Sequence, residues 1–238
     1  MYDKEYYRRL VWRRMEEENI ALFPRPVYGR IPNFIGSDKA ARLAVKLNEY
    51  LNANVIKANP DSPQKPLREL ILRDGKILIM ATPRIKKGFI ILDPRKIPSY
   101  KIPYASTIRG AFKYGRILNI NEIPHIDLIV EGSVAVSIRG ERIGKGEGYG
   151  ELEYAILREL DLIDEDISII TTVHEIQIFD RLPQDIFDVS IDYIITPSKV
   201  IKCQGPRRRP KGIYWDMLPN KRIEEIPILK QLKLLKLR

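Results

Sequence analysis

The segment 137–157, SIRGERIGKGEGYGELEYAIL, places a glycine-rich stretch between a strand-like run and a helix-like run. Its glycines are Gly140, Gly144, Gly146, Gly148 and Gly150. Glycines let backbone N–H groups approach an anion closely, and the following helix N-terminus adds roughly half a positive charge. Arg142 and Lys145 add formal charge, and an arginine can hold two phosphate oxygens at once. The loop therefore predicts a phosphate-binding site, although a structural glycine-rich turn would have the same composition.

The spacing of these glycines differs from the two most familiar nucleotide loops. The run G-x-G-x-G-x-G at 144–150 has neither the G-x-G-x-x-G dinucleotide pattern nor the G-x-x-x-x-G-K-[ST] pattern. Glu151 and Glu153 open the helix that follows, and at two residues apart they cannot share a helix face. Glu151, beside the loop, is the better candidate to hold a Mg²⁺ that screens bound phosphates. The alternative is an ordinary acid that complements the helix dipole.

Strand-like and helix-like segments alternate along the chain and must position this loop. Helical spacing predicts helices over 3–19, 37–51, 66–74, 105–115, 149–161 and 221–236. Short apolar runs predict strands over 53–59, 76–82, 88–93, 127–137, 167–173 and 192–197. A proline-rich connector, 23–34, excludes helix between the first two helices. The alternation predicts an α/β domain with a mostly parallel sheet that is covered on both faces.

The C-terminal end of the chain is strongly basic. Residues 199–238 carry 12 Lys and Arg against 3 acids, and QGPRRRPKG at 204–212 has the composition of a turn or linker. We therefore expect one domain over 1–203 and a basic extension over 204–238. In the terminal helix an apolar stripe (Ile226, Leu229, Leu232 and Leu235) predicts docking on the same domain. The cations Arg207–Arg209, Lys211, Lys230, Lys233 and Lys236 suggest weak RNA binding, and a solvated helix face is the alternative.

Composition excludes several classes of protein. The single cysteine, Cys203, excludes an internal disulfide framework, and the two histidines, His125 and His174, are too few for a typical transition-metal centre. His174 follows a predicted strand, where it could polarise a ligand, but a buried histidine with a satisfied hydrogen bond is the simpler interpretation. The start, MYDKEYYRRLVWRR, has no apolar leader, so we expect a cytoplasmic protein without a membrane span.

The segment RIGKGEGYGELEYA resembles the nucleotide-binding signature R-x-G-x-G-x-G-Y-Y-D of the 5-formyltetrahydrofolate cyclo-ligase family, also called methenyltetrahydrofolate synthetases. The likeness covers most of residues 4–201. It includes WRRMEEENIALFPRPVYGRIPNFIGSDKAA, LIMATPR, VEGSVAVS and LPQDIFDVSIDYIITPSKVI, which look like the branch named for a methenyltetrahydrofolate synthetase domain.

The resemblance implies a fold and an activity. The fold is a single Rossmann-like, three-layer α/β domain with a mostly parallel mixed sheet, similar to CoA-transferases. The activity is closure of 5-formyltetrahydrofolate to the 5,10-methenyl form with ATP and Mg²⁺. ATP phosphorylates the formyl oxygen, N10 attacks the activated carbon, and phosphate leaves. No protein nucleophile is needed.

The resemblance also implies roles for individual residues. Lys4 and Arg8 match the K-x-x-x-R of the family's first helix, where they share one face. Without the resemblance, the KEYYRR run is typical of solvated helix surface. The residues expected to bind ATP are Lys4, Arg8, Arg142, Gly144, Lys145, Gly146, Gly148 and Tyr149. Lys4 and Arg142 are also expected to be catalytic, and Glu151 takes the place of the family's aspartate as the Mg²⁺ ligand.

Departures from the family pattern concern the substrate. Gly150 replaces the second tyrosine of G-Y-Y-D, and Ile85 follows Arg84 where the enzymes often have tyrosine. Asp61 is the nearest candidate for the acidic residue that contacts folate. The substrate is therefore a folate or a modified pterin, and the alternative is a non-catalytic nucleotide- or RNA-binding protein on the same fold.

Overall fold

The computed structural model describes residues 2–236, and its centre is an eight-stranded mixed sheet with the order β11-β10-β8-β5-β1-β2-β3-β4. The strands are β1 (Val55–Ala58), β2 (Ile77–Ala81), β3 (Phe89–Leu92), β4 (Arg116–Ile117), β5 (Leu128–Val130), β8 (Ser168–Thr172), β10 (Tyr193–Ile195) and β11 (Val200–Lys202). The pairs from β10 to β2 are parallel, whereas β3, β4 and β11 are antiparallel to their neighbours. The expected mostly parallel α/β sheet is confirmed.

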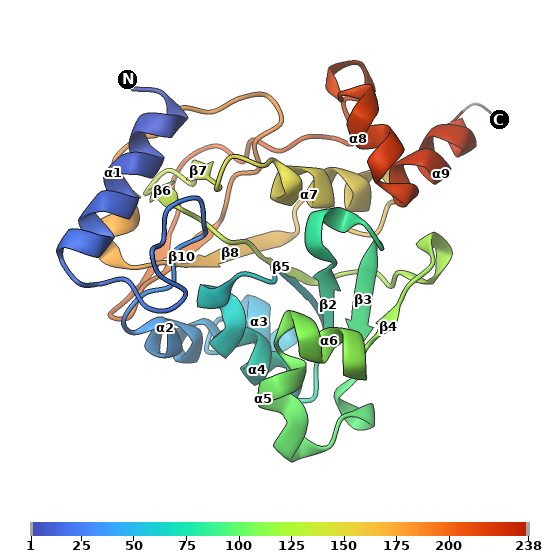
Figure 1. Ribbon diagram of the computed structural model, residues 1–238, viewed down its shortest axis with the longest axis horizontal. Helices are drawn as coiled ribbons and strands as arrows, with labels where there is room; N and C mark the ends of the chain where they lie inside the picture. Colours follow the sequence, from blue (N-terminus) through green and yellow to red (C-terminus); the bar gives the residue numbers. More distant parts are fainter. Residues whose placement is uncertain (1, 237–238) are drawn as a thin grey trace.

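Helices cover both faces of this sheet (Figure 1). The helices are α1 (Lys4–Glu17), α2 (Ser37–Ala44), α3 (Asn48–Asn52), α4 (Lys65–Arg73), α5 (Ile102–Ala105), α6 (Ile108–Tyr114), α7 (Tyr149–Glu159), α8 (Asn220–Glu225) and α9 (Pro227–Lys236). Along β2, Leu78 and Met80 face the core under α2 and α4, whereas Ile79 and Ala81 face the core under α7 and α9. This alternation follows from the two-residue period of a strand.

A second, three-stranded sheet was not predicted. It consists of β6 (Ala135–Ser137), β7 (Arg142–Ile143) and β9 (Ile178–Phe179), with β7 and β9 on either side of β6. The predicted single strand over 127–137 is therefore wrong: β5 ends at Val130, and β6 belongs to the other sheet. The chain turns between them at Gly132, where a Cβ would lie 3.2 Å from the side chain of Ile31. A Cβ would also lie 3.0 Å from Asp61 Oδ2, so glycine suits this close approach.

The predicted helix over 37–51 is also wrong as a single element. It ends at Ala44, and α3 begins after Leu47, whose backbone is extended. The break turns Tyr50 into the core, where its hydroxyl donates a hydrogen bond of 2.6 Å to Asp74, and it leaves Leu51 exposed, although helical spacing over 37–51 would place Leu51 on the apolar face. Tertiary packing of one aromatic residue thus overrides the helical period.

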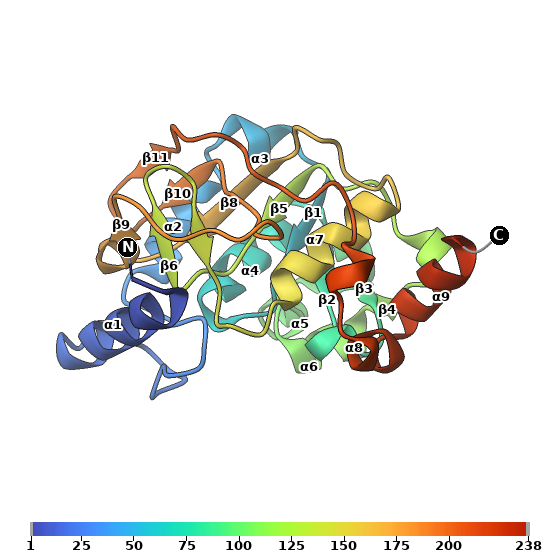
Figure 2. The ribbon, with the colours of Figure 1, turned by 90° about the horizontal axis from the view of Figure 1, so that it is seen from above.

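The predicted helix over 221–236 is two helices, because Pro227 cannot continue α8. Ile226, before the proline, has extended dihedral angles of −111° and 104°. Ile226, Leu229 and Leu232 are buried against the domain as the stripe predicts, but Leu235 is exposed. The side chain of Lys236 lies outside the described part of the chain. Figure 2 shows α8 and α9 at the opposite end of the sheet from the N-terminus.

No helix within residues 2–236 combines the length and the apolar character needed to cross a bilayer.

Candidate functional site

The glycine loop connects β7 to α7 and lies over the carboxyl ends of the central parallel strands. Gly146 and Gly148 have φ values of +101° and +69°, a left-handed conformation that glycine adopts without strain. Gly148 is the residue before the first turn of α7, so the loop and the positive end of the helix meet there. Ligands of open α/β sheets bind at such strand ends.

Two polar cavities lie on either side of this loop. The first, which we call the strand-end cavity, has a volume of about 320 Å³ and is lined by residues that follow three parallel strands: Asn59, Thr82 and Gly132. The second, which we call the α1 cavity, has a volume of about 210 Å³ and lies between the loop, α1 and residues 185–188. The two cavities share Arg142, Gly144, Gly148 and Glu151.

Arg142 is the buried cation between the two cavities. One guanidinium nitrogen donates to the Gly132 carbonyl at 2.7 Å, and the other pairs with Glu151. Its Nε is buried without a hydrogen-bond partner. Burial lowers the pKa of Arg142, but the carboxylates of Glu151, Glu131 and Asp188 outweigh burial and raise it above its ordinary value. Arg142 is therefore a permanently charged group between two cavities.

Lys4 and Arg8 both line the α1 cavity, as their shared helix face predicts. Arg8 Nε donates to the Gly144 carbonyl at 2.8 Å and thus holds the loop. Lys4 Nζ lies 2.7 Å from Asp185 and 2.6 Å from Asp188. Sequence reasoning did not single out these two aspartates. Their i,i+3 spacing inside LPQDIFDVS was the signal available for them.

Glu151 and Asp188 both line the α1 cavity and are close enough for the charge of one to act on the other, so they are the pair of oxygen ligands that we consider there. Burial raises the pKa of Asp188, Lys4 opposes this rise, and the Glu151 carboxylate adds to it. The described residues contain no group of three or more metal-ligating side chains. Mg²⁺ bound with substrate phosphates usually takes only one or two carboxylates. The donor set therefore fits a phosphate-linked Mg²⁺ rather than a metal held by protein alone.

A buried ionic triad lies beside the strand-end cavity, and one of its members, Glu153, lines that cavity. Lys57 Nζ lies 2.6 Å from both Glu131 and Glu153, and it donates to Asn59 Oδ1 at 3.1 Å. The Lys57 side chain is 0% exposed. Burial lowers the pKa of Lys57, but the two carboxylates outweigh it and raise that pKa. Burial raises the pKa of Glu153 to about 7, and Glu131 adds to this rise while Lys57 opposes it.

Sequence reasoning missed this triad because its members come from β1, the end of β5 and the middle of α7. Glu153 had been considered only as a helix-start acid. A lysine inside an apolar strand, VIKA, was the one local signal. Such a lysine requires a buried counter-charge, which the sequence does not locate.

The residues that depart from the family pattern gather around the strand-end cavity. A Cβ on Gly150 would lie 2.9 Å from Glu131 Oε2, which is buried without a partner. Glu131 and a side chain at position 150 therefore compete for the same space. Asp61 lines the cavity, and burial raises its pKa while Lys145 and Arg68 oppose this rise. Arg84 also lines it, and Arg84 and buried Ile85 both have φ of +56°, a strained conformation for non-glycine residues.

Other candidates have structural roles. His174 Nδ1 accepts a hydrogen bond of 3.3 Å from the Ile176 N–H and caps a short 3₁₀ turn. Arg207 and Arg209 bind the Asp192 carboxylate at 2.7 and 2.5 Å. These two arginines hold the extension on the sheet, so two cations of the basic cluster suggested for RNA are already paired with a carboxylate.

Fold and site together define a Rossmann-like α/β protein with a cationic glycine loop at the strand ends. The chain belongs to the 5-formyltetrahydrofolate cyclo-ligase family, whose model matches residues 7–197.

Named relatives agree with this family, and a solved structure agrees with the fold. The chain is 37% identical over 235 residues to the methenyltetrahydrofolate synthase domain-containing protein of Bos taurus, covering 97% of this chain and 62% of that protein. The Homo sapiens protein of the same name is also 37% identical over 235 residues, covering 97% and 61%. The chain thus spans about three fifths of the length of these relatives. The NMR structure of Aquifex aeolicus 5,10-methenyltetrahydrofolate synthetase superimposes with a TM-score of 0.54 at 20% identity, covering 86% of this chain and 94% of that one.

Proposed function

We propose that the protein is an ATP- and Mg²⁺-dependent cyclo-ligase that closes a 5-formyl tetrahydropterin, a folate or a modified pterin, to its 5,10-methenyl form. The observation that carries this proposal is that Arg142 and the glycine loop line two polar cavities at once. ATP phosphates in the α1 cavity and a formyl-bearing ring in the strand-end cavity would meet at Arg142. Family membership supports the same chemistry.

The proposed reaction has two steps. The γ-phosphoryl group leaves ADP and bonds to the formyl oxygen, and N10 then attacks the formyl carbon. N10 loses its proton, and the carbon–oxygen bond breaks with release of phosphate. Phosphoryl transfer depends mainly on positioning and on stabilising the charge that develops. The chain supplies cations for this purpose and needs no nucleophile.

Each cation has a distinct proposed task. Arg142 would bind the transferred phosphoryl group, because it is charged, buried and between both cavities. Lys4 would bind phosphates after exchanging its aspartate partners for them. Arg8 holds the loop through Gly144 and would orient its N–H groups. Lys145 lines the strand-end cavity beside Glu147, at 2.8 Å, and would contact the substrate side.

Mg²⁺ would be held by Glu151 and Asp188 together with the phosphates, and when bound it would neutralise phosphate charge. Glu151 now pairs with Arg142, and Asp188 pairs with Lys4. Both carboxylates therefore already have cationic partners that phosphates can take over. A single cysteine agrees with a reducing compartment, and we infer a cytoplasmic location.

The test is absorbance at the methenyl product's band, with purified protein, 5-formyltetrahydrofolate and Mg-ATP. We expect product that requires both ATP and Mg²⁺, and loss of at least about tenfold in rate for Glu151→Ala, because a metal ligand is removed. Glu165→Ala, an exposed acid beyond the far end of α7, serves as the control and should match wild type. Product formation that is unaffected by Glu151→Ala would contradict the metal assignment.

A second candidate is a nucleotide-binding protein without cyclo-ligase turnover. The buried charges beside the strand-end cavity and the conflict between Glu131 and any side chain at position 150 favour it. ATP binding by calorimetry without any methenyl product would support this second function. RNA binding would then be tested with variants of Lys230 and Lys233, two exposed cations on α9.

A further inference from the structure

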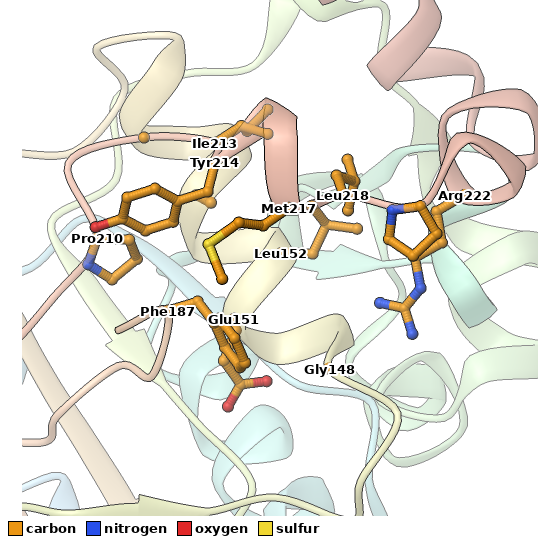
Figure 3. Close-up of a pocket in the computed structure, with 13 residues that line it drawn as sticks. Gly148, Glu151, Leu152, Phe187, Pro210, Ile213, Tyr214, Met217, Leu218 and Arg222 are labelled. Carbon is orange, nitrogen blue, oxygen red and sulfur yellow. The ribbon is translucent and has the colours of Figure 1, made fainter. Parts of the chain in front are cut away.

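The C-terminal extension and α7 enclose an apolar slot that neither polar cavity includes. The slot has a volume of about 170 Å³. Its apolar lining comes mainly from Leu152, Ala155, Phe187, Ile213, Tyr214 and Met217 (Figure 3). The last three residues belong to the extension, which lies beyond the residues 7–197 that match the family model. This slot is thus built in large part from sequence outside the family domain.

The slot lies next to the α1 cavity at the start of α7. The two share Gly148, Glu151 and Phe187, so one extended ligand placed across these residues would reach both. Arg222 stands at this end of the slot, and Figure 3 shows its guanidinium on the side of Gly148. One end of the combined space is cationic and the other is apolar. That is the arrangement a nucleotide requires.

Specific contacts hold the extension against the glycine loop. Arg222 donates a hydrogen bond to the Glu147 carbonyl, and its guanidinium lies 4.8 Å from the centre of the Tyr149 ring. Farther along α7, Glu159 accepts a hydrogen bond of 3.0 Å from the Ile213 N–H. The extension is therefore placed by the same loop and helix that would bind phosphates.

We propose that the extension completes a nucleobase pocket, in which the slot holds the base of ATP while its phosphates lie in the α1 cavity. A base is flat and apolar on both faces, and it gains from stacking on aromatic side chains and from contact with a polarisable thioether. Tyr214, Phe187 and Met217 provide these groups. The inference rests on the proposed nucleotide binding, and it adds the place of the base and the part of the chain that recognises it.

The test compares calorimetric binding of ATP with that of tripolyphosphate, which lacks the base. Tyr214 and Met217 are 36% and 58% exposed, so their truncation should leave folding intact. We expect Tyr214→Ala and Met217→Ala each to weaken ATP binding by about five- to fiftyfold, within the range for loss of base stacking, and to leave tripolyphosphate unchanged. Leu234→Ala, on the exposed side of α9, is the matched control and should change neither ligand.

Arg142→Ala separates this inference from the proposed function. It should weaken both ligands by about five- to 150-fold, the range for loss of a charge-assisted hydrogen bond. If Arg142→Ala has that effect while Tyr214→Ala and Met217→Ala leave ATP binding unchanged, the phosphate site stands and the base pocket is wrong. Equal weakening of ATP and tripolyphosphate by the two slot variants would also overturn it. Failure of wild type to bind either ligand would overturn both proposals.

Discussion

At the scale of single residues, the most consequential feature is Lys57, a fully buried ammonium between Glu131 and Glu153. Taking three charges out of water is costly, and a buried ion pair is often no more stable than an apolar replacement. Such a triad is therefore weak evidence for stability. Because Glu153 lines the strand-end cavity, the triad suits a role in shaping the charge of the proposed substrate pocket. Glu131 Oε2, which is buried without a hydrogen-bond partner, lies next to Gly150, a residue that lines that pocket.

Lys57→Met should lower the free energy of unfolding by about 3–5 kcal/mol, because it leaves two carboxylates buried without a cation. The triple variant Lys57→Met/Glu131→Met/Glu153→Leu should recover most of this loss, because it removes all three charges of the triad together. Denaturant unfolding at pH 7 measures both. Lys86→Met, on the exposed surface, is the control. A triple variant as unstable as the single one would show that the side chains matter for shape rather than charge.

At the scale of elements, α9 links the extension to the core over β2 and β3. Pro227 starts this helix, and Leu229 is 0% exposed, packed in the same core cluster as Ile79 and Phe89. The positions of α8 and of Arg222 depend on this anchor, because α8 is only six residues long and could not form alone. The terminal helix α9 therefore supports the glycine loop indirectly, by holding α8 and with it Arg222. We propose that residues 204–238 act as one unit added to the domain 1–203.

Leu229→Ala should destabilise the protein by about 2–5 kcal/mol through loss of burial and the cavity left behind. Leu234→Ala, five residues along the same helix but 64% exposed, should change stability by less than about 0.5 kcal/mol. Hydrogen exchange should show faster exchange in α8 and α9 for the first variant only. Uniformly faster exchange over the whole sheet would mean that the extension does not open separately.

At the scale of the whole molecule, one carboxylate joins the sheet edge to the extension. Asp192 accepts hydrogen bonds from the Ile169 N–H at 2.8 Å and from Arg207 and Arg209. The segment after β11 therefore runs back along the sheet toward α7 before it reaches α8 (Figure 2). Cys203 lies on this path, and its N–H donates to the Asp192 carbonyl at 2.8 Å. The reactivity of this thiol therefore reports whether the extension stays packed against the sheet.

Burial raises the pKa of Cys203 to about 12, and the Asp192 carboxylate adds to this rise. The folded protein therefore keeps the thiol proton at pH 8, whereas an unfolded thiol with a pKa of about 8.5 is partly ionised. We expect an aromatic disulfide reagent at pH 8 to label the folded protein at least about 100-fold more slowly than the unfolded one. The same difference in pKa predicts stability that falls as pH rises above about 9.

The control for this labelling is Cys203→Ser/Ser99→Cys, which moves the single thiol to an exposed position. It should react at nearly the unfolded rate without denaturant. If native Cys203 is labelled as fast as the exposed cysteine of this control, the extension does not stay packed over the thiol.

The sequence by itself determined the features that depend on neighbours in the chain. Alternating runs predicted the α/β sheet, and the glycines before α7 predicted the loop, because periodicity and left-handed turns are local properties. Lys4 and Arg8 were correctly expected to share a helix face, and both line the α1 cavity. The breaks at Leu47 and Gly132 escaped prediction, because one serves the packing of Tyr50 and the other a contact with Ile31.

Only the tertiary structure decided which distant residues share a site. Lys57 and Glu131 are 74 positions apart and meet because β1 and β5 pair in parallel. Asp188 reaches Lys4 across 184 positions, and Arg222 reaches the glycine loop from the extension. The physical reason is that sheet order and helix docking are long-range choices driven by burial, and local sequence patterns carry no record of which strands become neighbours.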